Sequence, residues 1–76
     1  MKTAQLVEQI PNLNTFKKYG RVTRVVGLMI ESQGPADSSI GDVCKIHVPS
    51  KNGDQIILSE VVGFKDEIVI LMPYSS

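Results

Sequence analysis

Two kinds of hydrophobic periodicity divide the chain near residue 19. Between residues 3 and 16 the apolar side chains recur at three- and four-residue steps, which is typical of one face of an α-helix. These residues are Leu6, Val7, Ile10, Leu13 and Phe16. Pro11 interrupts the pattern, because proline removes a backbone donor and disfavours helix at the preceding residue. Residues 1–18 are therefore predicted to form a short, broken amphipathic helix that packs on its own domain or on a partner.

The segment after Tyr19-Gly20 changes to β-branched residues and alternation. Four apolar residues fall on one predicted face, namely Val22, Val26, Leu28 and Ile30. Gly27 interrupts this run, and a glycine inside strand sequence marks a bulge or bend, so we expect two strands joined there. Residues 32–41 combine Gly, Pro, Asp and Ser and are predicted to form a loop.

The second half of the chain predicts three further strands. Residues 42–48 alternate cleanly, with Cys44, Ile46 and Val48 on the expected core side and His47 as an exposed strand residue. Residues 51–54 contain Asn-Gly and predict a hairpin into residues 55–62. After a turn at Lys65-Asp66, the apolar run 68–72 predicts a strand covered on both faces. The fold class is therefore all-β, a small barrel of five to six strands with an amino-terminal helical segment.

Composition restricts the possible functions. A chain of 76 residues fits one small domain, and its eight basic and eight acidic side chains balance. Proteins that bind nucleic acid usually carry a basic excess, so general DNA or RNA binding is disfavoured. The single cysteine excludes an internal disulfide and suits a reducing cytosol. The sequence has no long apolar run, so neither a signal peptide nor a membrane span is predicted.

Candidate chemistry is sparse. The loop 34–41, GPADSSIG, lacks the Gly-Lys-Ser/Thr ending of a phosphate-binding loop. Cys44 and His47 are three residues apart on one predicted strand, so their side chains point to opposite faces and should not meet. The acidic residues are scattered and form no pair suited to acid and base catalysis. We therefore expect no catalytic residue, no cofactor and no metal in this chain.

One concentrated basic patch lies at the junction of the two regions. It contains Lys17, Lys18, Arg21 and Arg24. The patch is either a solvated face or a surface that meets carboxylates of a neighbouring subunit, because the planar guanidinium of arginine suits interface carboxylates.

Two stretches, YGRVTRVVGLMIESQGPADSSIGDVCKI and SEVVGFKDEIVILMPY, give the chain a resemblance to a known family. Together they resemble the opening domain of flagellar and type III secretion export ATPases, which are relatives of rotary ATP synthase subunits. The resemblance covers residues 19–74. Its informative elements are Gly20, Val22, Gly27, the Ile40-Gly41-Asp42 step with Cys44, the run 60–64 and Leu71-Met72-Pro73.

The resemblance implies a non-catalytic domain, a barrel in the crown of a hexameric ring whose ATP and Mg are bound by a following domain absent here. It implies that residues 1–18 dock a stator-like regulatory protein, with Leu6, Val7 and Ile10 as docking candidates, and that residues 19–76 form the barrel. It makes Lys17, Lys18, Arg21 and Arg24 candidates for the contact with neighbouring subunits. The expected location is the cytoplasm, peripheral to the inner face of the cytoplasmic membrane through the export apparatus. A flagellar and an injectisome parent are not distinguished.

One departure from the family pattern predicts a defect in the barrel. Family members continue past the Met-Pro step into a further Gly-x-x-Val strand, whereas this sequence ends at Ser76. The last strand is expected to be missing, with an unpaired edge near the amino-terminal strand.

Two other classes of function compete with this interpretation. A barrel of the oligonucleotide-binding type also has short strands and glycine bends, but here the four aromatic residues are spread out rather than laid along one face. They are Phe16, Tyr19, Phe64 and Tyr74. An independent small enzyme is the weakest alternative, because paired titratable groups are absent.

Overall fold

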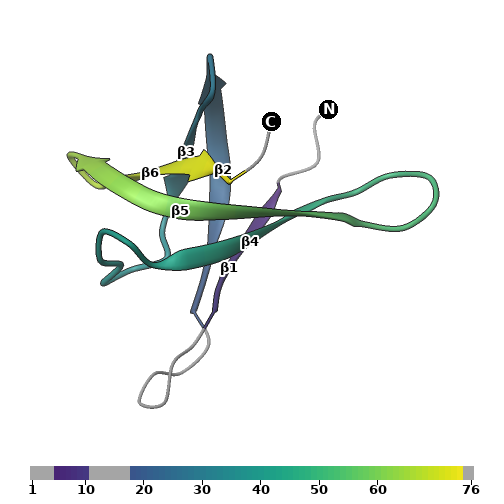
Figure 1. Cartoon of the computed structure of the whole chain (residues 1–76), viewed down its shortest axis with the longest axis horizontal. Coiled ribbons are helices and arrows are strands. Elements are labelled where there is room, and N and C mark those ends of the chain that lie inside the picture. The colour runs from purple at the N-terminus through teal and green to yellow at the C-terminus, as the bar shows by residue number, and fades with distance from the viewer. Residues whose placement is uncertain (1–4, 11–17, 75–76) are drawn as a thin grey trace.

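The computed structural model describes residues 5–10 and 18–74, and within them every regular element is a β-strand (Figure 1). The strands are β1 (Leu6–Gln9), β2 (Lys18–Val26), β3 (Met29–Gln33), β4 (Val43–Val48), β5 (Gln55–Lys65) and β6 (Ile68–Pro73). The described residues contain no helix that is long and apolar enough to span a membrane.

The six strands form one closed antiparallel barrel in the order β1-β2-β3-β6-β5-β4. The short β1 closes it, since Val7 pairs with Gly20 of β2 on one side and with Ile46 of β4 on the other. The predicted unpaired edge is therefore wrong: β1 occupies the gap between β2 and β4 and takes up the backbone donors and acceptors that those strands would otherwise expose.

The helical expectation is also wrong for Leu6–Gln9, which is strand. The spacing of Leu6, Val7 and Ile10 fits a helical face, but Val7 and Gln9 also alternate with the more exposed Leu6 and Glu8, as a half-buried strand requires. Pairing with two neighbours satisfies the backbone of this segment, and this outweighs the weak helix propensity of a short isolated piece. The rest of the predicted helix, residues 1–4 and 11–17, lies outside the described residues.

The hydrophobic core fills the interior of the barrel, where inward positions of five strands meet. It consists of Val7, Ile30, Cys44, Ile46, Val61, Val69 and Leu71. Val48 packs against this cluster, so the predicted inward set on β4 is confirmed. Of the four apolar residues predicted on one face of the first two strands, only Ile30 is buried and Val22 half-buried, because Val26 and Leu28 belong to the exposed tip of the β2–β3 hairpin.

Glycines and bulges bend the strands around this core. Gly27, with a φ of 61°, lies in the turn that joins β2 to β3, where the sequence predicted a bend. The pairing register shifts between Val22 and Arg24 on β2 and between Val61 and Gly63 on β5, so each strand carries a bulge. The predicted hairpin between β4 and β5 is confirmed. Bulges increase local twist, which helps a small sheet to close on itself.

The apolar run of β6 is covered on one face only. Val69 and Leu71 are buried inside the barrel, whereas Ile68 and Ile70 are half-buried and Met72 is 39% exposed on the outside. The prediction of a strand covered on both faces is therefore wrong for the chain as described. The outward-facing side chains of β6 are apolar and at least partly exposed, so they form part of the molecular surface.

Candidate functional site

The predicted basic patch is divided between two faces of β2. Lys18 is half-buried and pairs in register with the buried Gln9 at one end of the barrel, whereas Arg21 and Arg24 are exposed. Arg24 Nε lies 3.7 Å from Glu31 Oε1 on β3, so its charge is partly matched within the domain. Lys17 lies outside the described residues. The structure therefore leaves Arg21 as the most available cation of the described part of this set.

The predicted docking residues are also separated. Val7 is fully buried in the core, Leu6 is 43% exposed on the opposite face of β1, and Ile10 is 40% exposed just after the strand. The backbone N–H of Ile10 donates to the Val43 carbonyl at 2.9 Å, which continues the β1–β4 pairing by one residue. Among the three, Leu6 and Ile10 are accessible to a partner, and Val7 holds the strand in the barrel.

Cys44 and His47 lie on opposite faces of β4, as predicted from their spacing. Cys44 is completely buried, and desolvation, with a smaller contribution from the nearby Asp42 carboxylate, raises the pKa of its thiol from 9.0 to about 11. His47 is not an exposed residue as predicted: its side chain is 23% exposed, and Nε2 lies 3.0 Å from Glu8 Oε1, which accepts a hydrogen bond across the β1–β4 seam. Nothing in this geometry gives Cys44 the thiolate character of a nucleophile.

Asp42 ties the loop that precedes β4 to the barrel. Its Oδ2 accepts hydrogen bonds from Gln9 Nε2 at 2.5 Å and from the Ser39 backbone N–H at 2.8 Å. The Asp42 carbonyl also accepts from the backbone N–H of Val61 at 2.9 Å. One residue of the Ile40-Gly41-Asp42 step thus connects the loop, β1 and β5. Its role in the described structure is to hold the loop in place.

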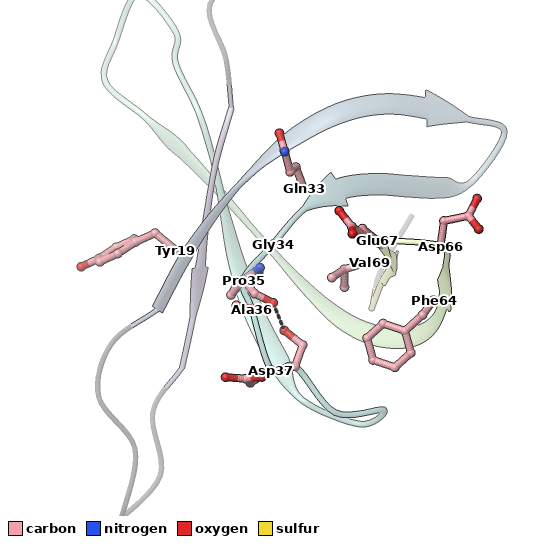
Figure 2. A pocket seen from close by; sticks show the side chains of 11 residues that line it. Tyr19, Gln33, Gly34, Pro35, Ala36, Asp37, Phe64, Asp66, Glu67 and Val69 are labelled. Carbon is pink, nitrogen blue, oxygen red and sulfur yellow. Dashed lines mark hydrogen bonds between the residues drawn. The ribbon is translucent and has the colours of Figure 1, made fainter.

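The loop after β3 and the β5–β6 turn enclose a groove of about 530 Å³ (Figure 2). Its apolar lining comes from Phe64 and Val69 on one side and Pro35 on the other. Three carboxylates, Asp37, Asp66 and Glu67, lie among its lining residues. Among the residues that the structure describes, these carboxylates form no ion pair. We call this feature the acidic groove.

The side chains around the acidic groove differ in where they point. Figure 2 shows the Phe64 ring and Val69 on the side of the β5–β6 hairpin, whereas the Tyr19 ring points away from the hollow. Phe64 is 48% exposed, so a large part of its ring is open to solvent. A ligand with an apolar body and a positively charged head matches this combination of apolar lining and acidic surroundings.

A second surface lies on the outside of β1, β4 and β5. Lys45 is exposed there and pairs in register with Glu8 on β1 and Leu58 on β5. Leu58 lies beside Lys45, and Leu6 and Ile56 lie on the two sides of His47, two residues further along β4. These three apolar side chains are between 43% and 48% exposed. We call this surface, defined by Leu6, Lys45, Ile56 and Leu58, the Lys45 face. It combines exposed apolar side chains with a cation that forms no ion pair among the described residues.

Neither surface was predicted from the sequence. The acidic groove is built from the end of β3, its following loop and the β5–β6 turn, which are about 30 residues apart along the chain and are brought together by the pairing of β3 with β6. The Lys45 face could have been found in part from the outward positions of β4, because Lys45 alternates with Cys44 and Ile46. The register that sets Leu58 beside Lys45 and Leu6 beside His47 was not readable from the sequence.

The comparisons with known proteins agree on one family. The family model of the ATP synthase alpha/beta family, beta-barrel domain, matches residues 22–76. The chain is 53% identical over 74 residues to the flagellum-specific ATP synthase of Bacillus subtilis and 38% identical over 68 residues to that of Borreliella burgdorferi. It is 32% identical over 69 residues to the type 3 secretion system ATPase of Xanthomonas euvesicatoria.

The matched region is a small part of each relative. It covers 97% of this chain but 16% of the Bacillus subtilis protein, and 91% of this chain but 15% of the Xanthomonas euvesicatoria protein. No solved structure matches the chain. The similarity is therefore to one small barrel region of these ATPases.

Proposed function

Because the chain belongs to the ATP synthase alpha/beta family and matches the β-barrel domain of that family, we propose that it is the non-catalytic oligomerisation and partner-docking domain of a flagellum-specific or type III secretion ATPase. The relatives named above are ATP synthases and secretion ATPases by name. The chain spans about a sixth of their length, so the catalytic work is assigned to the part of the protein that this sequence does not contain.

One observation carries the assignment of a binding role: the outside of the barrel is rich in exposed apolar side chains. They occur on several strands, and Leu6, Ile56, Leu58, Phe64 and Met72 are each at least 39% exposed. Soluble domains that act alone rarely expose extended apolar surface, whereas domains that assemble do. The barrel itself is closed, so these side chains are available for contacts between domains rather than for completing the fold.

Barrels placed side by side would hold the following ATPase domains in register, so that a group from one subunit can complete the site of its neighbour. ATP and Mg belong to that following domain in this proposal, and this chain has no Gly-Lys-Ser/Thr sequence with which to bind them. Its contribution is to position subunits. Lys17, Lys18, Arg21 and Arg24 remain candidates for the subunit contact, and among the described members Arg21 is the most available.

The amino-terminal segment is proposed to dock a stator-like regulatory protein. Leu6 and Ile10 expose apolar surface on or just after β1. The segment enters the barrel at β1, so a partner bound to it would be linked directly to the strand that closes the fold. We propose that the parent ATPase lies in the cytoplasm, where the export apparatus holds it at the inner face of the cytoplasmic membrane.

A deletion in the parent ATPase tests the proposal. Removing residues 1–73 should abolish ring assembly, which sedimentation measures. ATP hydrolysis should then depend more steeply on protein concentration, because sites shared between subunits form only in the ring. The 76-residue chain alone should hydrolyse no ATP. A deleted parent that assembles and hydrolyses ATP like the intact protein would refute the assembly role.

A further inference from the structure

The acidic groove and the Lys45 face share no residue. In the closed order β1-β2-β3-β6-β5-β4, the carboxylates of the groove lie in the loop after β3 and in the turn between β5 and β6, whereas the Lys45 face is formed by β1, β4 and the first part of β5. Two different surfaces that complement each other allow a head-to-tail contact between identical molecules.

The two surfaces are complementary in charge. The groove presents three carboxylates and the Lys45 face presents one exposed ammonium group, and none of these charges has an ion-pair partner among the described residues. The carboxylate of Glu8, which lies directly opposite Lys45 in the β1–β4 register, is 3.0 Å from His47 Nε2. Arg21 is less suited to reach the groove of a second copy, because it pairs in register with Gln33, which lines the groove of its own chain.

They are also complementary in their apolar surface. Phe64, 48% exposed, gives the groove an open apolar wall, and Leu58, 46% exposed, lies directly beside Lys45 in the β4–β5 register. A lysine side chain can pack its aliphatic stem on an aromatic or aliphatic surface while its ammonium group reaches a carboxylate at the rim. The groove of about 530 Å³ has room for such a side chain.

We propose that the acidic groove of one barrel receives Lys45 and the apolar side chains around it from a second copy of this chain. This inference rests on the proposed assembly role and names its contact surfaces: Glu67, Asp66 and Phe64 on one side, and Lys45 with Leu58 on the other. The contact is heterologous, so repeated copies form a ring or a filament and not a two-fold dimer. It is small and strengthened by charge, which makes it weak for an isolated barrel and sensitive to salt.

Charge reversal with complementation tests the contact on the chain itself. Self-association is measured by sedimentation equilibrium at low ionic strength, up to about 1 mM protein, which is the range expected for a small isolated contact. Lys45→Glu and Glu67→Lys should each weaken self-association about tenfold, because each sets like charges against each other. An equimolar mixture of the two variants should recover association to within about threefold of the wild type, because one contact keeps its original charges and the other has both charges exchanged.

Matched controls use exposed charges away from both surfaces. Lys51→Glu and Asp54→Lys in the β4–β5 loop change the net charge by the same amounts and should leave self-association within about twofold of the wild type. Circular dichroism checks that each variant keeps its strand content.

Four results would overturn the inference. The first is a wild-type chain that stays monomeric at about 1 mM, and the second is a pair of charge reversals that act no more strongly than their controls. The third is a mixture of the two variants that associates no better than either variant alone. The fourth is a Glu67→Lys variant that binds the wild type more tightly than the wild type binds itself, which would indicate groove-to-groove pairing. If the parent still loses its ring on deletion of residues 1–73 while these reversals have no effect, the proposed function stands and this contact is wrong.

Discussion

Gly20 lies where two parts of the backbone approach most closely. A Cβ atom added there would overlap the backbone of Gln33 and Gly34, at the point where β3 leaves the barrel. The same place starts the loop that forms one wall of the acidic groove. The requirement for glycine at this position is therefore one of space, since Gly20 itself is not among the residues with positive φ.

Replacing Gly20 with alanine should destabilise the barrel by about 2–3 kcal/mol, because the displaced atoms are backbone and cannot move independently. Urea unfolding followed by circular dichroism measures this loss. Gly63→Ala is the matched control: it also lies in a strand, a Cβ there meets nothing within 4 Å, and the expected change is within about 0.5 kcal/mol. Equal effects of the two substitutions would contradict the close approach.

The buried thiol of Cys44 makes a pH-dependent contribution to stability. Its pKa is raised from 9.0 to about 11 in the folded barrel, so the unfolded chain releases the proton at lower pH. The stabilising effect is fully present below pH 9 and is lost as the pH rises toward 11. Relative to Cys44→Ala, the wild type should lose on the order of 2 kcal/mol of unfolding free energy between about pH 8 and about pH 11. Parallel pH profiles of the two proteins in urea unfolding would show that the thiol does not titrate as described.

The short strand β1 completes the barrel. Its four residues pair with both β2 and β4 and turn an open sheet into a closed barrel. The strand separates two roles by alternation: Val7 enters the core, and Leu6 remains on the outside as part of the Lys45 face. A short strand can do this because its backbone is paired on both sides.

Aspartate scanning of β1 distinguishes a strand from a helical arm. Val7→Asp should unfold the barrel or cost at least about 3 kcal/mol, because it buries an unpaired charge. Leu6→Asp, one residue away on the half-exposed face, should cost less than about 1 kcal/mol. Thermal unfolding compares the two variants directly. Similar small losses for both would indicate that Leu6–Gln9 does not pair within the barrel.

The whole molecule has balanced charge and dispersed aromatic side chains, and both properties bear on the competing nucleic-acid role. It carries eight basic and eight acidic residues, and its groove is surrounded by carboxylates. Single-stranded nucleic acid requires a cationic path with stacking aromatics. The described aromatic residues form no common stacking face: Phe64 and Tyr19 both border the groove, but the Tyr19 ring points away from it (Figure 2). Tyr74 follows β6.

A titration with fluorescent single-stranded DNA should therefore show no saturable anisotropy change at moderate salt with up to about 100 μM protein, a range in which even non-specific binders with Kd near 10⁻⁴ to 10⁻⁶ M would respond. A basic nucleic-acid-binding domain in the same buffer serves as the positive control. Binding that weakens steeply as salt increases would favour the nucleic-acid role over assembly.

Local patterns along the chain were sufficient to predict the all-β class, the β4–β5 and β5–β6 hairpins, the inward set on β4 and the family. Each of these depends on alternation, turn residues or a local motif, which are readable over ten residues or fewer. The same local reading failed at Leu6–Gln9, because a four-residue segment is compatible with both periodicities and only pairing partners decide between them.

The closure of the barrel and the surfaces that it presents depend on contacts between distant parts of the chain. Strand order and register place β1 between β2 and β4, bring residues 33–38 beside residues 64–69, and set Leu58 beside Lys45. These neighbours are far apart along the chain, and a shift of one residue in register would move each side chain to the other face of the sheet. The acidic groove and the Lys45 face therefore depend on non-local pairing, which no short pattern of hydrophobic and polar residues specifies.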